Sequence, residues 1–260
     1  MDLGLRDKVV FISGSARGIG KEIARAFLQE GARVILNDID AAALGETQKE
    51  FQETYGVSVG ARLCNIADEA SVVKLFQELG EAYGCLDVLV NNAGIIIDRQ
   101  IVDMSFEEWR RIFSVNIDSY FLCTREAVKI MRAERHPVIL NAGSVATLVP
   151  AMGYGCYAVT KAAVLNLTKV TCGELASRGI RVIGYLPGMT NTAINKDVFK
   201  AEPQRICAQI PLNRIAEPEE IGRVVAFLAS DAASYMAGSM VQIDGGKLCV
   251  QNPDRYSRRS

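Results

Sequence analysis

Three side chains between residues 144 and 161 have the types and spacing that proton transfer requires: Ser144, Tyr157 and Lys161. A phenol normally loses its proton near pH ~10, which is too high for a base at neutrality. An ammonium one helical turn away would stabilise the phenolate and lower the pKa of Tyr157. Tyr157 could then take a proton from a secondary alcohol or return one to a carbonyl oxygen that Ser144 holds by a hydrogen bond. None of the three groups accepts a hydride, so a redox reaction here needs a cofactor.

A Tyr-x-x-x-Lys pair alone is common and could occur on a helix by chance, so the elements around it matter. The apolar run 137–142 predicts a buried strand, and Ser144 stands just past its end. Strand ends in open α/β sheets carry chemistry. Apolar residues at 158, 162, 165 and 167 predict a helix that presents Tyr157 and Lys161 on one face. The three groups could therefore meet in one cleft.

A second set of candidates lies near the N-terminus, where the strand-like run 8–13 is followed by Gly14-Ser-Ala-Arg-Gly-Ile-Gly20 and a helix beginning near Lys21. Small glycines let a backbone approach a pyrophosphate, and the amides at a helix start attract its charge. A glycine turn between a strand and a helix need bind nothing, so this signal is weak by itself.

The next predicted strand, 32–37, ends at Asp38, about 20 residues after the glycines. An acid there can bind the two ribose hydroxyls of an adenosine and would repel a 2′-phosphate, which favours NAD over NADP. The alternative is a turn aspartate that ends a strand. Arg17 is a cation in the glycine turn that could accommodate a phosphate. We give Asp38 more weight, because a like charge at the ribose is the more direct conflict.

Strands and helices alternate through the rest of the chain. The pattern predicts helices at 41–55 and 68–83, with Asp68 as N-cap, a helix opening at Pro218, and strands at 57–63, 86–90 and 239–243. There is no repeat, low-complexity segment or linker. This order indicates a single α/β domain over residues 1–260 with a parallel sheet of about seven strands wound on both faces.

Composition narrows the function classes. The chain has 260 residues, 49% of them hydrophobic and 23% charged, which is typical of a soluble globular protein. A net charge of −1 gives no case for nucleic acid or an anionic membrane. No apolar run approaches ~18 residues and the start lacks a signal-peptide core, so the cytoplasm is the expected compartment.

Cysteine and histidine usage argues against two other classes of site. The seven cysteines form no Cys-x-x-Cys pair and are expected to be reduced, buried small hydrophobes. The single histidine, His136, leaves little room for a Ser-His-Asp hydrolase or a multi-histidine zinc site, and we expect no metal.

Five motifs together resemble the short-chain dehydrogenase/reductase family over residues 8–246. They are a Thr-Gly-x-x-x-Gly-x-Gly turn (13–20, with Ser13 for the threonine), Asn-Asn-Ala-Gly (91–94), the tetrad Asn116, Ser144, Tyr157 and Lys161, a Pro-Gly-x-x-x-Thr segment (187–192) and Asp244-Gly-Gly246. Asn65, where many members have aspartate, and Leu186 also depart from the family pattern. None of the departures touches the tetrad.

The resemblance implies a Rossmann-type fold and a role for each matched residue. Asn116 would carry a water that links Lys161 to solvent, and Lys161 would also bind the nicotinamide ribose. The residues implied to bind the dinucleotide are Gly14, Ser15, Arg17, Gly18, Ile19, Gly20, Asp38, Asn65, Ile66, Asn91, Ala93, Gly94, Tyr157, Lys161, Pro187, Gly188, Thr190 and Thr192. The resemblance also implies a homotetramer or homodimer built partly on the Tyr157 helix and the element after it.

These observations favour an oxidoreductase that transfers a hydride between NAD(H) and a secondary alcohol or ketone. The family has a substrate-covering loop at the position of residues 190–212, and nearly all positions expected to border the substrate are apolar: Ile95, Ile96, Ile97, Val145, Leu148, Met152, Tyr154, Met189, Ile194 and Phe199. We therefore expect a lipophilic substrate, a hydroxysteroid or 3-oxoacyl compound ahead of a sugar.

Three alternatives stay open. They are an NADPH-dependent 3-oxoacyl-carrier-protein reductase, a polyol or sugar dehydrogenase, and a binding subunit that senses the dinucleotide without catalysis. Asp38 argues against the usual cofactor of the first, and intact Ser144, Tyr157 and Lys161 argue against the last. The polar tail 250–260, with Arg255, Arg258 and Arg259, is a solvated tail or a subunit contact.

Overall fold

A single parallel sheet organises the part of the chain that the computed structural model describes, residues 2–250 and 253, without the side chains of residues 197 and 198. The strand order is β3-β2-β1-β4-β5-β6-β7. All neighbouring pairs are parallel. The strands are β1 Val9–Ser13, β2 Arg33–Asp38, β3 Gly60–Leu63, β4 Val88–Asn91, β5 Val138–Ala142, β6 Arg181–Pro187 and β7 Met240–Ile243. The predicted α/β fold is confirmed. Arg255, Arg258 and Arg259 of the tail lie outside the described residues.

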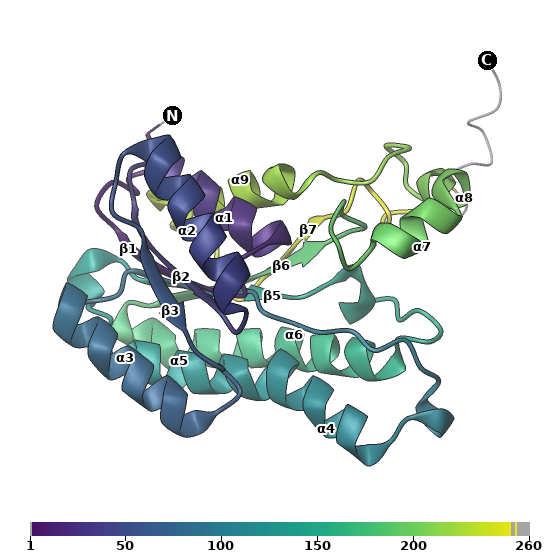
Figure 1. The fold of residues 1–260 in the computed structure, drawn as a ribbon, viewed down its shortest axis with the longest axis horizontal. Coiled ribbons are helices and arrows are strands. Elements are labelled where there is room, and N and C mark those ends of the chain that lie inside the picture. The colour runs from purple at the N-terminus through teal and green to yellow at the C-terminus, as the bar shows by residue number, and fades with distance from the viewer. Residues whose placement is uncertain (1, 251–252, 254–260) are drawn as a thin grey trace.

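Helices cover both faces of this sheet (Figure 1). On one face lie α1 (Gly18–Gln29), α2 (Ala41–Tyr55) and α9 (Pro218–Ala229); on the other lie α3 (Glu69–Tyr83), α5 (Ser119–Ile130) and α6 (Gly155–Leu175). The α4 helix (Phe106–Phe113) leads through a π-helical turn into α5, and the short helices α7 (Lys196–Ala201) and α8 (Pro203–Ala208) follow β6.

Alternate strand residues fill two cores, one on each side of the sheet. In β1, Val10 and Ile12 pack with side chains of α1 and α9, whereas Val9 and Phe11 pack with side chains of α3 and α5. Phe11 contacts Phe76 with ring centroids 5.3 Å apart. A strand that is buried on both faces has no polar alternation. This explains why the strands read in the sequence as continuous apolar runs.

The strand order reverses direction between β1 and β4, which are neighbours in space although β2 and β3 lie between them in sequence. Ligands of open α/β sheets bind beyond the carboxyl ends of the strands at such a switch point. The glycine turn follows β1, the Asn-Asn-Ala-Gly segment overlaps the end of β4, Ser144 follows β5, and residues 187–192 follow β6. The fold therefore brings all four motifs to one edge of the sheet.

Most element boundaries lie within two residues of the prediction, and two starts differ by three residues. The α1 helix begins at Gly18 rather than near Lys21, because the glycine turn itself forms the first helical turn. The β3 strand begins at Gly60 rather than Val57, because Gly56 ends α2 in a left-handed conformation and Val57 remains exposed. As predicted, Asp68 caps α3 by accepting a hydrogen bond from the Ser71 amide (2.8 Å).

The seven cysteines differ in how far they are buried. Cys123 and Cys156 are buried, but Cys249 is exposed and the other four are half-buried, so the prediction that all are buried is wrong. Cys249 lies after β7, the last strand, where the chain has left the core. Over the described residues, no cluster of three or more His, Cys, Asp or Glu side chains could hold a metal, and no helix is long and apolar enough to cross a membrane.

Candidate active site

The structure brings Ser144, Tyr157 and Lys161 together at the carboxyl end of β5. Ser144 follows β5 and caps a short 3-10 turn, where its hydroxyl accepts a hydrogen bond from the Ala146 amide (3.1 Å). Tyr157 lies in the first turn of α6, with Lys161 one turn further on. Tyr157 is half-buried and Lys161 is 3% exposed.

The amine of Lys161 is held inside the protein by hydrogen bonds to two neutral oxygen atoms. Its Nζ donates to the Ala142 carbonyl at 2.7 Å and to the Tyr120 hydroxyl at 3.3 Å, and it lies 5.7 Å from the centroid of the Tyr157 ring. Burial lowers the pKa of Lys161 to about 7, because the charged form loses its hydration. The protein therefore holds an amine that changes charge near neutral pH.

Burial also raises the pKa of Tyr157, and a side-chain contact with Ser144 acts in the opposite direction. The prediction that the pKa of Tyr157 is lowered by Lys161 is wrong, because burial dominates. Desolvation disfavours both the phenolate and the ammonium, and Lys161 donates its hydrogen bonds to other oxygens.

Asn116 lies in the π-helical turn Ser114–Asp118, where the amide of residue 119 bonds to the carbonyl five residues before it. Its side chain is fully buried and pairs with the backbone of Ile95, accepting from the amide (2.8 Å) and donating to the carbonyl (3.0 Å). It also donates to the Thr160 hydroxyl (3.1 Å). The side chain thus clamps the loop after β4 and uses both of its N–H donors, and we expect the predicted water to bind the main-chain carbonyl of Asn116.

The glycine turn is too tight for any side chain at two of its positions. A Cβ on Gly14, whose φ is +62°, would lie 2.8 Å from the Ala93 Cα, and one on Gly20 would lie 2.1 Å from the Gly14 carbonyl oxygen. Over the described residues, no side chain accepts a hydrogen bond from the amides of residues 18–20 at the start of α1. Such a helix start attracts an anion. Thr192 lies against Gly18, with its Cγ2 3.6 Å from the position of an ideal Cβ.

Three residues to which the sequence analysis gave no role in the site hold this turn in place: Ser13 and Asn92, which lie in matched motifs, and Tyr185, which lies in none. The Ser13 hydroxyl accepts from the amides of Asn92 (3.0 Å) and Ala93 (3.2 Å). The Asn92 amide group donates back to the carbonyls of Ser13 (3.0 Å) and Gly14 (3.1 Å). Tyr185 donates to Asn92 Oδ1 (3.2 Å). Two features of the sequence could have identified these supports: the hydroxyl that Ser13 keeps in place of the usual threonine, and the two adjacent asparagines at 91 and 92.

Three predicted cofactor residues point their side chains away from the crevice. The Ser15 hydroxyl, fully buried, accepts from the Asn37 amide (2.9 Å). The Asn91 side chain donates to Asn141 Oδ1 (2.9 Å) inside the molecule. The fully buried Thr190 donates its hydroxyl hydrogen to the carbonyl two residues before it (3.0 Å). These side chains brace the sheet edge, so contacts from them to a cofactor are restricted to main-chain atoms.

Asp38 ends β2, Arg17 lies in the glycine turn before α1, and the two side chains are held differently. The Asp38 carboxylate accepts from the amides of Ala16 (3.2 Å), Ile39 (2.8 Å) and Asp40 (3.1 Å), which fixes it beside the glycine turn. The Arg17 guanidinium pairs with Asp40 instead, and its side chain is 61% exposed. The carboxylate is rigidly placed, whereas the cation is held by one exposed ion pair.

The two residues predicted to flank an adenine differ in exposure. Asn65 is exposed and its Oδ1 accepts from the Ala67 amide (3.1 Å). Ile66 is only 5% exposed and packs in the core beside Phe76. Asn65 is therefore the better placed of the two to meet a ligand.

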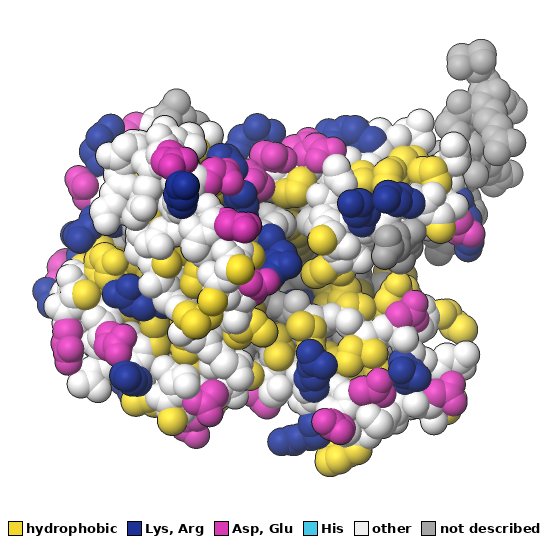
Figure 2. Space-filling model, in the orientation of Figure 1, with side chains coloured by type: hydrophobic (Ala, Val, Ile, Leu, Met, Phe, Trp, Pro, Cys, Tyr) yellow, Lys and Arg dark blue, Asp and Glu magenta, His cyan; other side chains and the backbone are white. Residues whose placement is uncertain are grey.

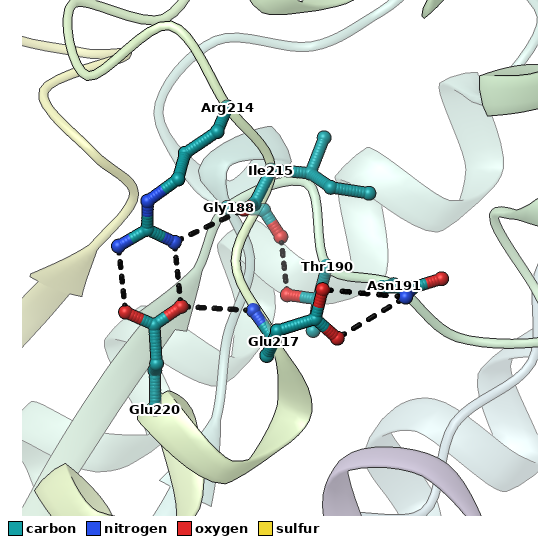
Figure 3. A network of polar contacts seen from close by, with 7 residues as sticks. All are labelled: Gly188, Thr190, Asn191, Arg214, Ile215, Glu217 and Glu220. Carbon is teal, nitrogen blue, oxygen red and sulfur yellow. Dashed lines mark hydrogen bonds and ion pairs between the residues drawn. The ribbon is translucent and has the colours of Figure 1, made fainter.

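The segment after β6 is tied to the start of α9 by a polar network (Figure 3). Arg214 makes two bonds of 2.7 Å to the Glu220 carboxylate, which holds the pKa of Glu220 down at about 2. Asn191 donates to the Glu217 carboxylate (3.1 Å), and the Ala216 amide donates to the Met189 carbonyl (2.9 Å). A cavity of about 460 Å³ adjoins this network, and its lining residues are Met189, Pro211, Leu212, Arg214, Ala216, Glu220 and 242–246.

Large apolar side chains are exposed on the loops around the tetrad. The loop after β4 and the loop before α6 are joined by a hydrogen bond from the Arg99 amide to the Gly153 carbonyl (2.8 Å). The space-filling view shows apolar surface lining the hollow near these loops (Figure 2). The exposed apolar residues of the 101–102, 148–152 and 194 segments are Ile101, Val102, Leu148, Val149, Met152 and Ile194. Of the predicted substrate-bordering residues, Met152 is 96% exposed and cannot be core.

Known proteins match this chain over nearly its whole length. Residues 14–247 match the family model described as enoyl-(acyl carrier protein) reductase. The chain is 38% identical over 242 residues to the 3-oxoacyl-[acyl-carrier-protein] reductase FabG of Thermotoga maritima, covering 93% of this chain and 98% of the relative. It is 34% identical to a 3alpha-hydroxysteroid dehydrogenase of Mediterraneibacter gnavus, covering 94% and 98%.

A solved structure agrees with these matches. The L-sorbose reductase of Gluconobacter frateurii, complexed with NADPH and L-sorbose, superposes with a TM-score of 0.91 at 30% identity, covering 96% of this chain and all of that one. The tetrad, the glycine turn and the strand order agree with the resemblance seen in the motifs. The chain belongs to the short-chain dehydrogenase/reductase family of oxidoreductases.

Proposed function

We propose that this protein is an NAD(H)-dependent dehydrogenase/reductase that interconverts a lipophilic secondary alcohol and its ketone. The observation that carries the proposal is the contact between the Ser144 and Tyr157 side chains beside the buried amine of Lys161. These groups suit proton exchange with a substrate oxygen.

The residues of the crevice fit a dinucleotide. A glycine turn with no room for a Cβ and amides at the start of α1 without side-chain partners among the described residues suit a pyrophosphate. A Cβ on Gly94 would lie 3.5 Å from Lys161 Nζ, so the absence of a side chain there leaves the amine accessible to a ribose. When bound, the nicotinamide ring supplies the hydride acceptor or donor that the side chains lack.

Two side chains of the protein have different roles in the proton transfer. Ser144 orients the substrate oxygen, and Tyr157 removes the hydroxyl proton in oxidation or returns it in reduction. Because burial raises the pKa of Tyr157, its phenol is protonated at neutral pH and is prepared to act as the acid for ketone reduction. Oxidation needs the phenolate, so we expect its rate to rise with pH.

Asp38 supports NAD over NADP. Three amides fix its carboxylate at the end of β2, where a 2′-phosphate would meet a like charge. Arg17, the cation of the glycine turn, is directed to Asp40. Binding a phosphate would require Arg17 to leave that pair.

The exposed apolar side chains around the tetrad support a lipophilic substrate. A contiguous apolar surface at a cleft is typical of ligand-binding sites. A buried substrate hydroxyl without a partner would cost about 1–3 kcal/mol, which disfavours a polyol. The hydroxysteroid dehydrogenase and 3-oxoacyl reductases among the relatives act on such compounds by name.

The second candidate, an NADPH-dependent 3-oxoacyl reductase, is favoured by one feature of the structure. The Arg17–Asp40 pair is exposed, and exposed ion pairs are weak, so Arg17 could turn to a 2′-phosphate at small cost. The relatives named FabG and the NADPH complex of the sorbose reductase point the same way.

A cofactor and substrate comparison tests the proposal. We expect higher kcat/KM with NADH than with NADPH, and turnover of hydroxysteroids or 3-oxoacyl thioesters above turnover of sugars. Asp38→Ser should relax the cofactor preference. A clear NADPH preference in the wild type would contradict the role of Asp38, and turnover of polyols alone would contradict the substrate class.

A further inference from the structure

Tyr120 is a fully buried tyrosine of α5 whose hydroxyl lies between the catalytic amine and the backbone of the cofactor crevice. It accepts a hydrogen bond from Lys161 Nζ (3.3 Å). It lies within donating distance of the Ala93 carbonyl (3.1 Å) and the Ala142 carbonyl (3.4 Å). Its ring also lies under the amine, with Nζ 5.2 Å from the ring centroid.

We propose that Tyr120 is a positioning residue for Lys161, which fixes the amine by accepting its hydrogen bond and links it to the Asn-Asn-Ala-Gly segment through the Ala93 carbonyl. It touches neither substrate nor cofactor in this role, and it acts through Lys161. The inference rests on the proposed function only in assigning Lys161 a part in the reaction.

The geometry of the amine supports this role. An ammonium has three N–H donors. Over the described residues, two of them are directed inward, to the Ala142 carbonyl and the Tyr120 hydroxyl. Fixing two donors determines the direction of the third. Without Tyr120 the amine keeps one anchor and can rotate about its bond.

Among the residues that the structure describes, no compensating charge faces the pair. The titratable groups that face Tyr120 are Tyr157 of α6, Tyr185 of β6 and Cys123 of α5. Burial raises the pKa of each of them, so each is neutral near pH 7. Burial also raises the pKa of Tyr120 itself, so its hydroxyl keeps its proton while it accepts from Lys161. Neutral oxygens alone therefore stabilise the ammonium.

Removing the hydroxyl should consequently change the titration of Lys161. A hydrogen bond to the charged form favours that form. In Tyr120→Phe we expect the pKa of Lys161, about 7 in the wild type, to fall by about one pH unit.

The experiment is an NMR titration of the unliganded protein labelled with 15N at lysine Nζ. The Lys161 signal is identified as the one lost in Lys161→Met, and it should titrate far below the surface lysines. The matched control is Tyr185→Phe, which removes an equally buried hydroxyl that donates to Asn92 instead of meeting Lys161. In Tyr185→Phe the pKa of Lys161 should remain that of the wild type.

An unchanged Lys161 pKa in folded Tyr120→Phe, or an equal shift in Tyr185→Phe, would overturn the proposal. If Tyr120→Phe fails to fold, the wild type gives the answer: the ring signals of Tyr120 should titrate in step with Lys161 Nζ, and an unresponsive ring would refute the contact. A shifted Lys161 titration in a protein that shows no dehydrogenase activity would contradict the proposed function and leave the Tyr120 contact intact.

Discussion

Replacing Asn116 by alanine distinguishes a structural clamp from a member of a proton relay. The substitution deletes three hydrogen bonds, two to the backbone of Ile95 and one to Thr160, all in a fully buried position. At about 1 kcal/mol for each bond, the loss is roughly 3 kcal/mol. For a chain of this size that corresponds to a fall in Tm of roughly 6–12 °C.

Thermal unfolding and the pH dependence of kcat/KM are measured on the same preparations. The control is Ser119→Ala, which removes a fully buried hydroxyl that donates only to the Val115 carbonyl (2.6 Å) in the same π-helical region. We expect a small change in Tm for the control and the large fall for Asn116→Ala. The limbs of the pH profile should keep their positions, since the main-chain carbonyl remains. An unchanged Tm with lost activity would refute the clamp and place the amide in the reaction.

Two further predictions concern the supports of the site. Because Arg214 lowers the pKa of Glu220 from 4.5 to about 2, the pair stabilises the fold above pH 4.5 and this contribution is lost as the pH falls through about 2. The Tm of Glu220→Gln should therefore lie below that of the wild type at neutral pH, and the difference should shrink between these two pH values; a constant difference would contradict the assignment. Asp87→Asn removes the charge and one of the two oxygen acceptors that a buried carboxylate offers to Arg135 (2.5 and 2.7 Å), at the opposite edge of the sheet. It should cost about 2 kcal/mol, discounted because Arg135 is partly exposed, and leave the KM for the cofactor unchanged in steady-state assays. A raised KM would show that the two edges are coupled.

The fold could be predicted well because the two sequence signals used for it, apolar runs and helix caps, depend only on residues close together in the chain. Continuous apolar runs mark strands buried on both faces, and caps such as Asp68 mark helix starts. The bounds of α2 and the start of α9 agree with the prediction at Ala41, Tyr55 and Pro218. The start of β3 was misplaced because Val57 has strand-forming chemistry but no partner strand to pair with.

The site was predicted less completely, because its supports are contacts between residues far apart in the chain. Lys161 meets Tyr120 across 41 positions, and Asn92 meets Ser13 across 79. No spacing rule on a single helix or turn could reveal such pairs. Motif positions also gave no direction for a side chain, so Ser15 was expected to face the crevice although its hydroxyl braces β1 and β2.

The central claim is that the phenol of Tyr157 exchanges the proton with the substrate, and single-turnover kinetics of Tyr157→Phe test it most directly. The variant should bind NADH as the wild type does, judged by cofactor fluorescence, while the rate of the chemical step falls by about a thousandfold. A chemical step within about tenfold of the wild-type rate, with cofactor binding intact, would show that another group moves the proton.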